Sequence, residues 1–291
     1  MAFWIALLAA VSFAFGSVLQ QKGALQTPAA EGDPRFLAQV IRQPVWLLGG
    51  LCQVGGWVLQ AVALDTGSLV VVQSTVTLSL VIALPLGVRF TDQQVGRRSI
   101  IAAVAVVSGI TLFVAVGQPS GGIDEPGAAA WWSAILISAA AMTILGLSGT
   151  RRSGAPAAAL FACAAGVGFA LQASVTKVFM GQLGSGLSGI LTSWTTYVLI
   201  ISALLGFGLQ QSALKTGFLA PAMAASNATT LGVSVLLGLT VFGETLAGRN
   251  GHLAPAVIGL VIAVIGVIAL ATNPEGSSLR SGDASGRTSA A

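Results

Sequence analysis

Long apolar runs constrain this chain more than any other feature of its sequence. Nine runs are close to the ~20 residues that a helix needs to cross about 30 Å of hydrocarbon. A membrane barrel would instead show alternating segments of about ten residues. The sequence therefore predicts an all-α polytopic membrane protein with nine transmembrane helices. The predicted spans cover residues 2–20, 45–64, 67–88, 99–117, 129–147, 155–178, 188–211, 217–241 and 253–272.

Charged side chains are few and unevenly distributed. They make up 8% of the 291 residues, whereas soluble proteins average about 25%. When the loops are taken alternately, 11 of the 13 basic residues fall on one side of the membrane and only Lys177 and Arg249 on the other. Because loops rich in Lys and Arg are cytoplasmic, we expect a plasma (inner) membrane protein with its N-terminus outside and its C-terminus inside. The basic residues lie in short loops rather than on one soluble face, so nucleic acid is not an expected partner.

A repeated segment divides the chain into two halves. LQAVALDTGSL at 59–69 returns as LQQSALKTGFL at 209–219, 150 residues further on, and GSVLQ at 16–20 returns as GFALQ at 168–172. Spans one to four thus match spans six to nine. Corresponding spans are five apart, an odd number, so the two copies must insert in opposite senses. The predicted parts are a first repeat at 1–117, an outer linker with the joining fifth span at 118–154, an inverted repeat at 155–272, and a disordered cytoplasmic tail at 273–291.

Several motifs extend over both halves: GSVLQQKGAL at the end of span one, the closely coupled hairpin from Trp46 to Leu86, its counterpart from Trp194 to Gly243, and the glycine-containing VVSGITLF and AVIGVIAL. In these motifs the chain resembles the drug/metabolite transporter superfamily, and within it the nine-span branch of NIPA-type magnesium transporters and EamA-like proteins. The resemblance covers nearly all of residues 1–272. It implies two inverted halves around a central cavity that is exposed to each side in turn.

The chain departs from the NIPA-like pattern at one position. Where those proteins place a carboxylate in the second span, this chain has Gln53. A magnesium ion favours carboxylate oxygens and water. Neutral Gln53 therefore argues against magnesium as the solute without excluding it.

Polar side chains inside the predicted spans are the candidates for contact with a solute. An unpaired amide in hydrocarbon costs roughly 4–8 kcal/mol on an alkane scale, so these groups should face the bundle interior or water. The alternative is that they only bond neighbouring helices, at about 0.6 kcal/mol each. Trp57 would stack on an organic solute or pack against another helix. The candidates are Gln53, Trp57, Gln60, Gln73, Thr75, Thr77, Gln172, Ser226, Asn227 and Thr229.

Four further residues are candidates for gating. Asp65 and Lys215 are equivalent in the repeat, but inversion places them on opposite membrane faces, about 30 Å apart. Capping of tight helix junctions is the plainer role for both. Pro85 and Pro221 lie toward the cytoplasmic ends of spans three and eight, where they would permit bending. Ordinary proline kinks are the alternative there.

The predicted midplane carries no Asp, Glu or His. Proton relays normally use titratable groups inside the membrane, so we expect facilitated movement or exchange. No nucleophile–base set or carboxylate pair points to an enzyme, and no cofactor is expected. The leading hypothesis is a transporter of a small polar or amphipathic organic solute that works by alternating access. A NIPA-like magnesium or other divalent-cation transporter and a non-transporting membrane scaffold are the alternatives, and the sequence leaves a homodimer open.

Overall fold

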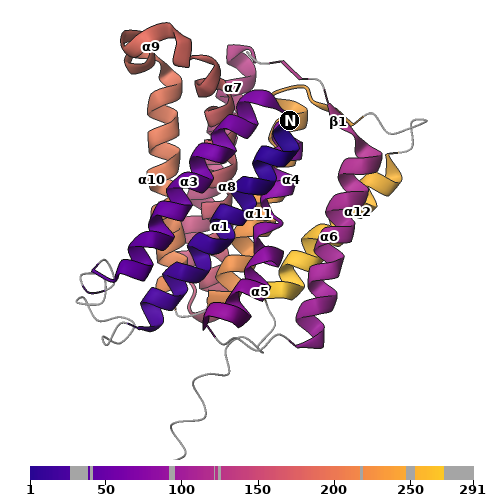
Figure 1. Cartoon of the computed structure of the whole chain (residues 1–291). Coiled ribbons are helices and arrows are strands. Elements are labelled where there is room, and N and C mark those ends of the chain that lie inside the picture. Colours follow the sequence, from indigo (N-terminus) through magenta and orange to yellow (C-terminus); the bar gives the residue numbers. More distant parts are fainter. Residues whose placement is uncertain are drawn as a thin grey trace, which may run out of the picture.

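A computed structural model describes residues 1–26, 39, 42–91, 96–120, 122–123, 126–216, 219–246 and 253–271. The predicted tail at 273–291 lies outside the described residues. Helices dominate the described part, and one two-stranded antiparallel sheet, β1 with β2, links two loops (Figure 1). The elements are α1 (Ala2–Leu25), α3 (Pro44–Thr66), α4 (Leu69–Val76), α5 (Ser79–Thr91), α6 (Arg97–Gly117), β1 (Pro119–Ser120), α7 (Ala128–Thr150), α8 (Gly154–Gly181), the 3-10 helix η1 (Leu183–Ser185), α9 (Gly186–Thr192), α10 (Trp194–Lys215), α11 (Leu219–Thr240), β2 (Thr245–Leu246) and α12 (Ala254–Ala271).

Within the described residues, seven helical segments are long and apolar enough to cross a membrane. Two shorter apolar helical segments, Ala225–Thr240 and Ala254–Ala269, follow them. An all-α polytopic membrane protein is therefore confirmed, while the count of nine spans stays a prediction. The seven segments are Ala2–Gln20, Pro44–Thr66, Leu69–Phe90, Ile100–Gly117, Ala128–Thr150, Pro156–Gly181 and Trp194–Ala213.

Two predicted spans differ from the helices that form. The span at 67–88 is divided between α4 and α5, which flank a turn at Thr77 and Leu78. The span at 188–211 starts too early, because α9 ends at Thr192 and α10 begins at Trp194. There the Ser193 hydroxyl accepts a hydrogen bond from the Thr195 amide, which ends one helix and begins the next.

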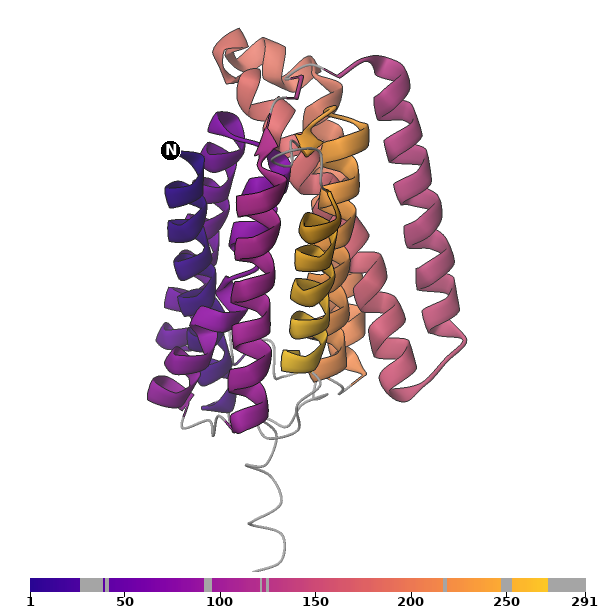
Figure 2. The same cartoon turned by 90° about the vertical axis from the view of Figure 1, so that its right-hand side faces the viewer.

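Helix α8 is the centre of the bundle. In its span 67% of the residues are buried, against 17–39% in the six others. Its sequence explains this position, because small side chains such as Ala158, Ala162 and Ala165 let neighbouring helices approach closely. It packs against α10, α11 and α7, and α7 stands at the margin of the bundle (Figure 2).

Glycines bring α6 and α12 into direct backbone contact. A Cβ atom on Gly109 would lie 2.6 Å from the carbonyl oxygen of Gly259, and a Cβ on Gly259 would lie 2.8 Å from that of Gly109. The neighbouring contacts are equivalent too: a Cβ on Gly109 would also meet Ala263 of α12, and a Cβ on Gly259 would also meet Phe113 of α6. Gly109 and Gly259 are 150 residues apart, as are Phe113 and Ala263, which is the spacing of the first repeated segment.

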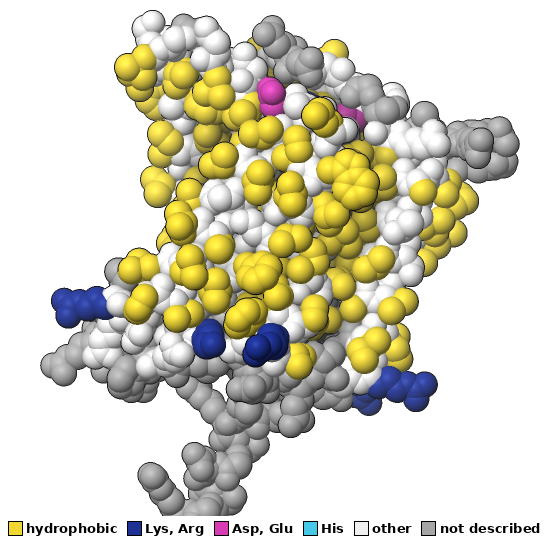
Figure 3. Space-filling model, in the orientation of Figure 1, with side chains coloured by type: hydrophobic (Ala, Val, Ile, Leu, Met, Phe, Trp, Pro, Cys, Tyr) yellow, Lys and Arg dark blue, Asp and Glu magenta, His cyan; other side chains and the backbone are white. Residues whose placement is uncertain are grey.

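The described charges are segregated to the two ends of the bundle. Figure 3 shows Lys and Arg side chains at the end opposite to the acidic ones. The arginine end carries the last turns of α1 and α5 with Lys22 and Arg89, the start of α6 and the α7–α8 junction. The other end, called the acidic end below, carries Asp65 and Glu244, together with Lys177 beside Glu244.

Candidate functional site

The interrupted helix α4–α5 begins in the interior of the bundle, where α4 is largely buried, and continues as α5 to its surface. Five hydrogen bonds define the interruption. The Thr75 and Thr77 hydroxyls donate to the carbonyls of Val71 and Gln73, at 2.8 and 2.9 Å. The Leu78 amide donates to Thr75 instead of Ser74, and those of Leu80 and Val81 also bond three residues back. Hydroxyl back-bonding of this kind loosens a helix, so the Ser-Thr-Val-Thr sequence accounts for the break.

Three buried polar atoms near the break have no hydrogen-bond partner in the described structure: Gln73 Nε2, Ser74 Oγ and Ser234 Oγ. Val70 of α4 lies against Gly238 of α11, and the two helices run in opposite directions. Four residues along each helix, at 1.5 Å per residue, bring Ser74 and Ser234 to the same level. Each such atom costs about 1–3 kcal/mol unless something bonds it, so this level of the bundle carries unmet hydrogen-bonding capacity.

The polar stretch of α11 lies on the arginine-end side of Ser234 and packs against α8. A Cβ on Gly166 would lie 2.7 Å from the Ser226 carbonyl and 2.8 Å from the Thr229 side chain. The Thr230 hydroxyl donates to the Ser226 carbonyl and also approaches that of Gly166, at 2.8 and 3.3 Å. Asn227, half-buried, also makes an interaction. Gly166 thus lets α8 meet this stretch at backbone distance.

Glu244 holds the first turn of α4 from the other half of the chain. Its side chain is fully buried and accepts hydrogen bonds from the amides of Leu69 and Val70, at 2.5 and 3.1 Å. The Ser68 hydroxyl donates to the same carboxylate at 2.6 Å and accepts from the Val71 amide. A carboxylate at a helix N-terminus satisfies free amides and complements the helix dipole.

Lys177 of α8 completes this junction. Its ammonium donates to the Gly67 carbonyl at 2.5 Å, lies 3.9 Å from Glu244 Oε1 and sits over the Phe242 ring at 5.5 Å. Lys177 therefore binds the C-terminal end of α3, and Glu244 binds the N-terminal end of α4, each with the charge that the helix dipole favours. We call Ser68, Lys177 and Glu244 the acidic-end seal.

Aromatic rings and a strand pair cover the seal. The Trp131 ring packs edge-on against Trp194 and Phe242, with centroids 5.2 and 5.8 Å apart. Gly122, at φ +101°, brings the linker after β1 against the Glu244 side chain, at 3.1 Å from its virtual Cβ. Trp131 of α7 and Trp194 of α10 thus meet the α3–α4 junction and the linker after β1 at this end.

Three predicted solute-contact residues, Gln73, Thr75 and Thr77, lie at the break, and the others lie elsewhere along the chain. Gln73, Thr75, Thr77 and Ser226 are buried. Trp57 is 54% exposed on the outer face of α3, away from this interior. The remaining candidates are half-buried: Gln53, which donates weakly to Ser17 at 3.3 Å, Gln60, Gln172, Asn227 and Thr229.

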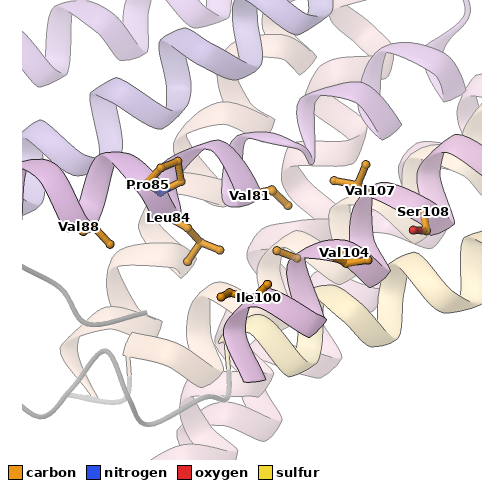
Figure 4. Close-up of a pocket in the computed structure, with 9 residues that line it drawn as sticks. Val81, Leu84, Pro85, Val88, Ile100, Val104, Val107 and Ser108 are labelled. Atoms are coloured by element: carbon orange, nitrogen blue, oxygen red, sulfur yellow. The ribbon is translucent and has the colours of Figure 1, made fainter. Parts of the chain in front are cut away.

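Two hollows on the described surface contact gating candidates rather than these residues. A polar hollow of about 500 Å³ at the acidic end is lined by Asp65, Lys177 and the start of α1. An apolar groove of about 460 Å³ lies between α5 and α6 and includes Pro85 (Figure 4). Lys215 ends α10 and Pro221 lies in the first turn of α11, and their side chains lie outside the described residues.

Sequence reasoning missed the seal and the two unpaired serines, Ser74 and Ser234. Hydropathy places Lys177 at the end of one predicted span and Glu244 just beyond another, where charged residues are common. The signal that would have found them is the pairing of one cation and one anion on the side of the membrane that has few charges. Ser74 and Ser234 carried no comparable signal, since one serine in an apolar run resembles any other.

No group of three His, Cys, Asp or Glu side chains suited to a metal ion occurs in the part of the chain that the structure describes. Cys52 and Cys163 are free thiols. The polar groups near the break are hydroxyls and an amide, which bind neutral or weakly charged groups through hydrogen bonds.

Comparison with known proteins finds similarity to an uncharacterized protein. The chain is 29% identical over 278 residues to this protein, from Corynebacterium glutamicum, and the match covers 94% of this chain and 96% of that protein. No family model matches the chain. No solved structure matches it. The similarity extends over nearly the full length of both proteins, so the relative shares the membrane-spanning region as a whole.

Proposed function

We propose that this protein is a nine-span transporter built from two inverted repeats, at 1–117 and 155–272, joined by α7. The reciprocal contact of Gly109 with Gly259 supports the repeats. When two halves are related by a two-fold axis, a contact between two residues recurs between their counterparts in the other half. The antiparallel course of α6 and α12 supports inversion. Equivalent helices also pack alike: α1 lies on α3 and α8 lies on α10.

The solute that fits best is a small polar or amphipathic organic molecule. The observation that carries this proposal is the interrupted helix with buried, unpaired Gln73, Ser74 and Ser234. Discontinuous helices near the midplane form the binding sites of many secondary transporters. Hydroxyl and amide groups would bond a neutral polar solute without the carboxylates that a hard cation prefers.

Alternating access gives the acidic-end seal its role. The seal joins both repeats, since Ser68 belongs to the first and Lys177 and Glu244 to the second. Breaking it would free the start of α4, and α4 carries the candidate binding groups. We infer that the seal closes the outer side, that the arginine end is cytoplasmic as loop charge favours, and that the protein resides in the plasma (inner) membrane.

Flux through proteoliposomes tests the proposal. The purified protein is reconstituted and assayed with a panel of radiolabelled metabolites and, in parallel, with magnesium. We expect saturable metabolite flux that the double substitution Ser74→Ala and Ser234→Ala weakens at least tenfold. Ser138→Ala, which alters a buried serine of α7, is the matched control and should leave flux within twofold.

Other outcomes separate the alternatives. Magnesium flux without metabolite flux would favour the NIPA-like function. A protein that carries neither, and in which cysteines placed at Thr75, Gln53 and Asn227 stay unlabelled by water-soluble reagents, would be a scaffold. Tags on the two termini should be reached from opposite faces of the membrane, and finding both on one face would contradict the odd number of spans.

A further inference from the structure

The apolar groove between α5 and α6 faces sideways along the membrane-spanning surface. Its walls carry Val81, Leu84, Pro85 and Val88 from α5 and Ile100, Ala103, Val104, Val107 and Ser108 from α6. Ser108 is the one polar side chain among them. Figure 4 shows these side chains from the two neighbouring helices along the gap. The groove is thus an open, apolar depression between the two helices.

The groove exists because α6 is held elsewhere. The glycine contact ties α6 closely to α12, while α5 packs chiefly against α1. Proline at 85 leaves α5 without one backbone donor and with its ring against the preceding turn. The two helices therefore diverge, and their apolar faces stay partly exposed, as at Val104 and Ile100.

Arginines continue both walls at the arginine end of the bundle. Arg97 is three residues before Ile100 and so shares the groove face of α6. Arg89 is four residues after Pro85 and shares the groove face of α5. Both side chains are exposed. In the described part of the chain, neither makes a salt bridge.

We propose that this groove binds one anionic phospholipid from the leaflet at the arginine end, with an acyl chain between α5 and α6 and the phosphate at Arg89 and Arg97. The chemistry is complementary in both parts, because hydrocarbon meets an apolar wall and a phosphate meets two guanidinium groups that can bind it bidentately. Basic residues beside gaps between transmembrane helices are suited to anionic headgroups. The inference does not depend on transport.

Retention of lipid by the purified full-length protein tests the proposal. The protein is equilibrated in mixed micelles with equal amounts of phosphatidylglycerol and phosphatidylcholine, and bound lipid is counted by native mass spectrometry. We expect one preferentially retained phosphatidylglycerol. At about fivefold in affinity per arginine, Arg89→Gln with Arg97→Gln should lower this preference about 25-fold.

A matched pair of substitutions separates this site from general charge. Arg151→Gln with Arg152→Gln removes the same charge from the exposed α7–α8 junction at the same end and should retain the lipid. Equal loss in both double variants would overturn the proposal, because it would reflect bulk attraction to anionic lipid.

The proposed binding of an acyl chain in the groove is tested separately. Val104→Trp should fill the groove and abolish retention, whereas Ile137→Trp, at an exposed apolar position of α7, should not. If Val104→Trp does not fold, Val104→Ser replaces it and should weaken retention by making the wall polar. Undiminished retention in the folded Val104 variant, equal retention of both lipids, or displacement of the lipid by a transported solute at the same site would contradict the proposal.

Discussion

Replacing Glu244 by Gln tests the physical basis of the seal. The carboxylate accepts from Ser68, Leu69 and Val70, and hydrogen bonds to a charged group are each worth about 1.5–3 kcal/mol. A glutamine keeps one acceptor oxygen and turns an NH₂ group toward at least one of these donors. It also leaves Lys177 without its counter-charge. We therefore expect a local loss of about 2–4 kcal/mol, less than the full sum because the remaining oxygen still accepts.

Hydrogen exchange of the peptide over residues 68–76 is the assay that reports this loss locally. A destabilisation of about 2 kcal/mol or more should speed exchange of its first amides about 30-fold. Asp65→Asn is the control, because it removes an exposed acidic charge from the same end and should leave exchange unchanged. Unaltered exchange in Glu244→Gln, or an equal effect from Asp65→Asn, would refute the idea that Glu244 caps α4.

Three further outcomes are expected. Gly109→Ala should destabilise the fold by several kcal/mol and lower its thermal midpoint, because the new methyl would lie 2.5 Å from a backbone nitrogen of α12. Gly208→Ala has open space around it and should instead stabilise the fold by about 0.5–1 kcal/mol. Equal effects of the two substitutions would refute the close contact. Ser234→Ala should leave the thermal midpoint unchanged or raised, because it removes an unpaired buried hydroxyl, and a large drop would reveal a partner. Trp57→Ala should leave solute flux within twofold, because its ring is exposed on the outer face, and abolished flux would place it at the solute path.

The helices could be predicted from the sequence because apolar runs of span length have few alternative structures in lipid. Seven predicted spans matched helical segments that are long enough to cross, and the α7 and α8 bounds differed by at most three residues. The break at Thr77 could not be found in this way, since Ser and Thr in an apolar run lower hydropathy only slightly. It depends on which carbonyl each hydroxyl bonds, and hydropathy does not report that.

Burial of the polar candidates was only partly predictable. Gln73 and Thr77 are both buried, whereas Trp57, which was expected to stack on a solute or to pack against another helix, is exposed. Which side of α3 faces the bundle is decided by its neighbour α1, where Gly56 receives the Phe13 ring. The partnership of Ser68 and Glu244 spans 176 residues, so no local pattern encodes it.

That long separation also sets an order of events during biosynthesis. Chains are made and inserted from the N-terminus, at about 5–20 residues per second. The first turn of α4 must therefore wait for α11 to emerge before its amides meet Glu244, an interval of roughly 9–35 seconds for 176 residues at that rate. In the nascent protein, Ser68, Leu69 and Val70 depend on water or on the insertion machinery for their bonds, so the start of α4 reaches its final form only after most of the second half has been made.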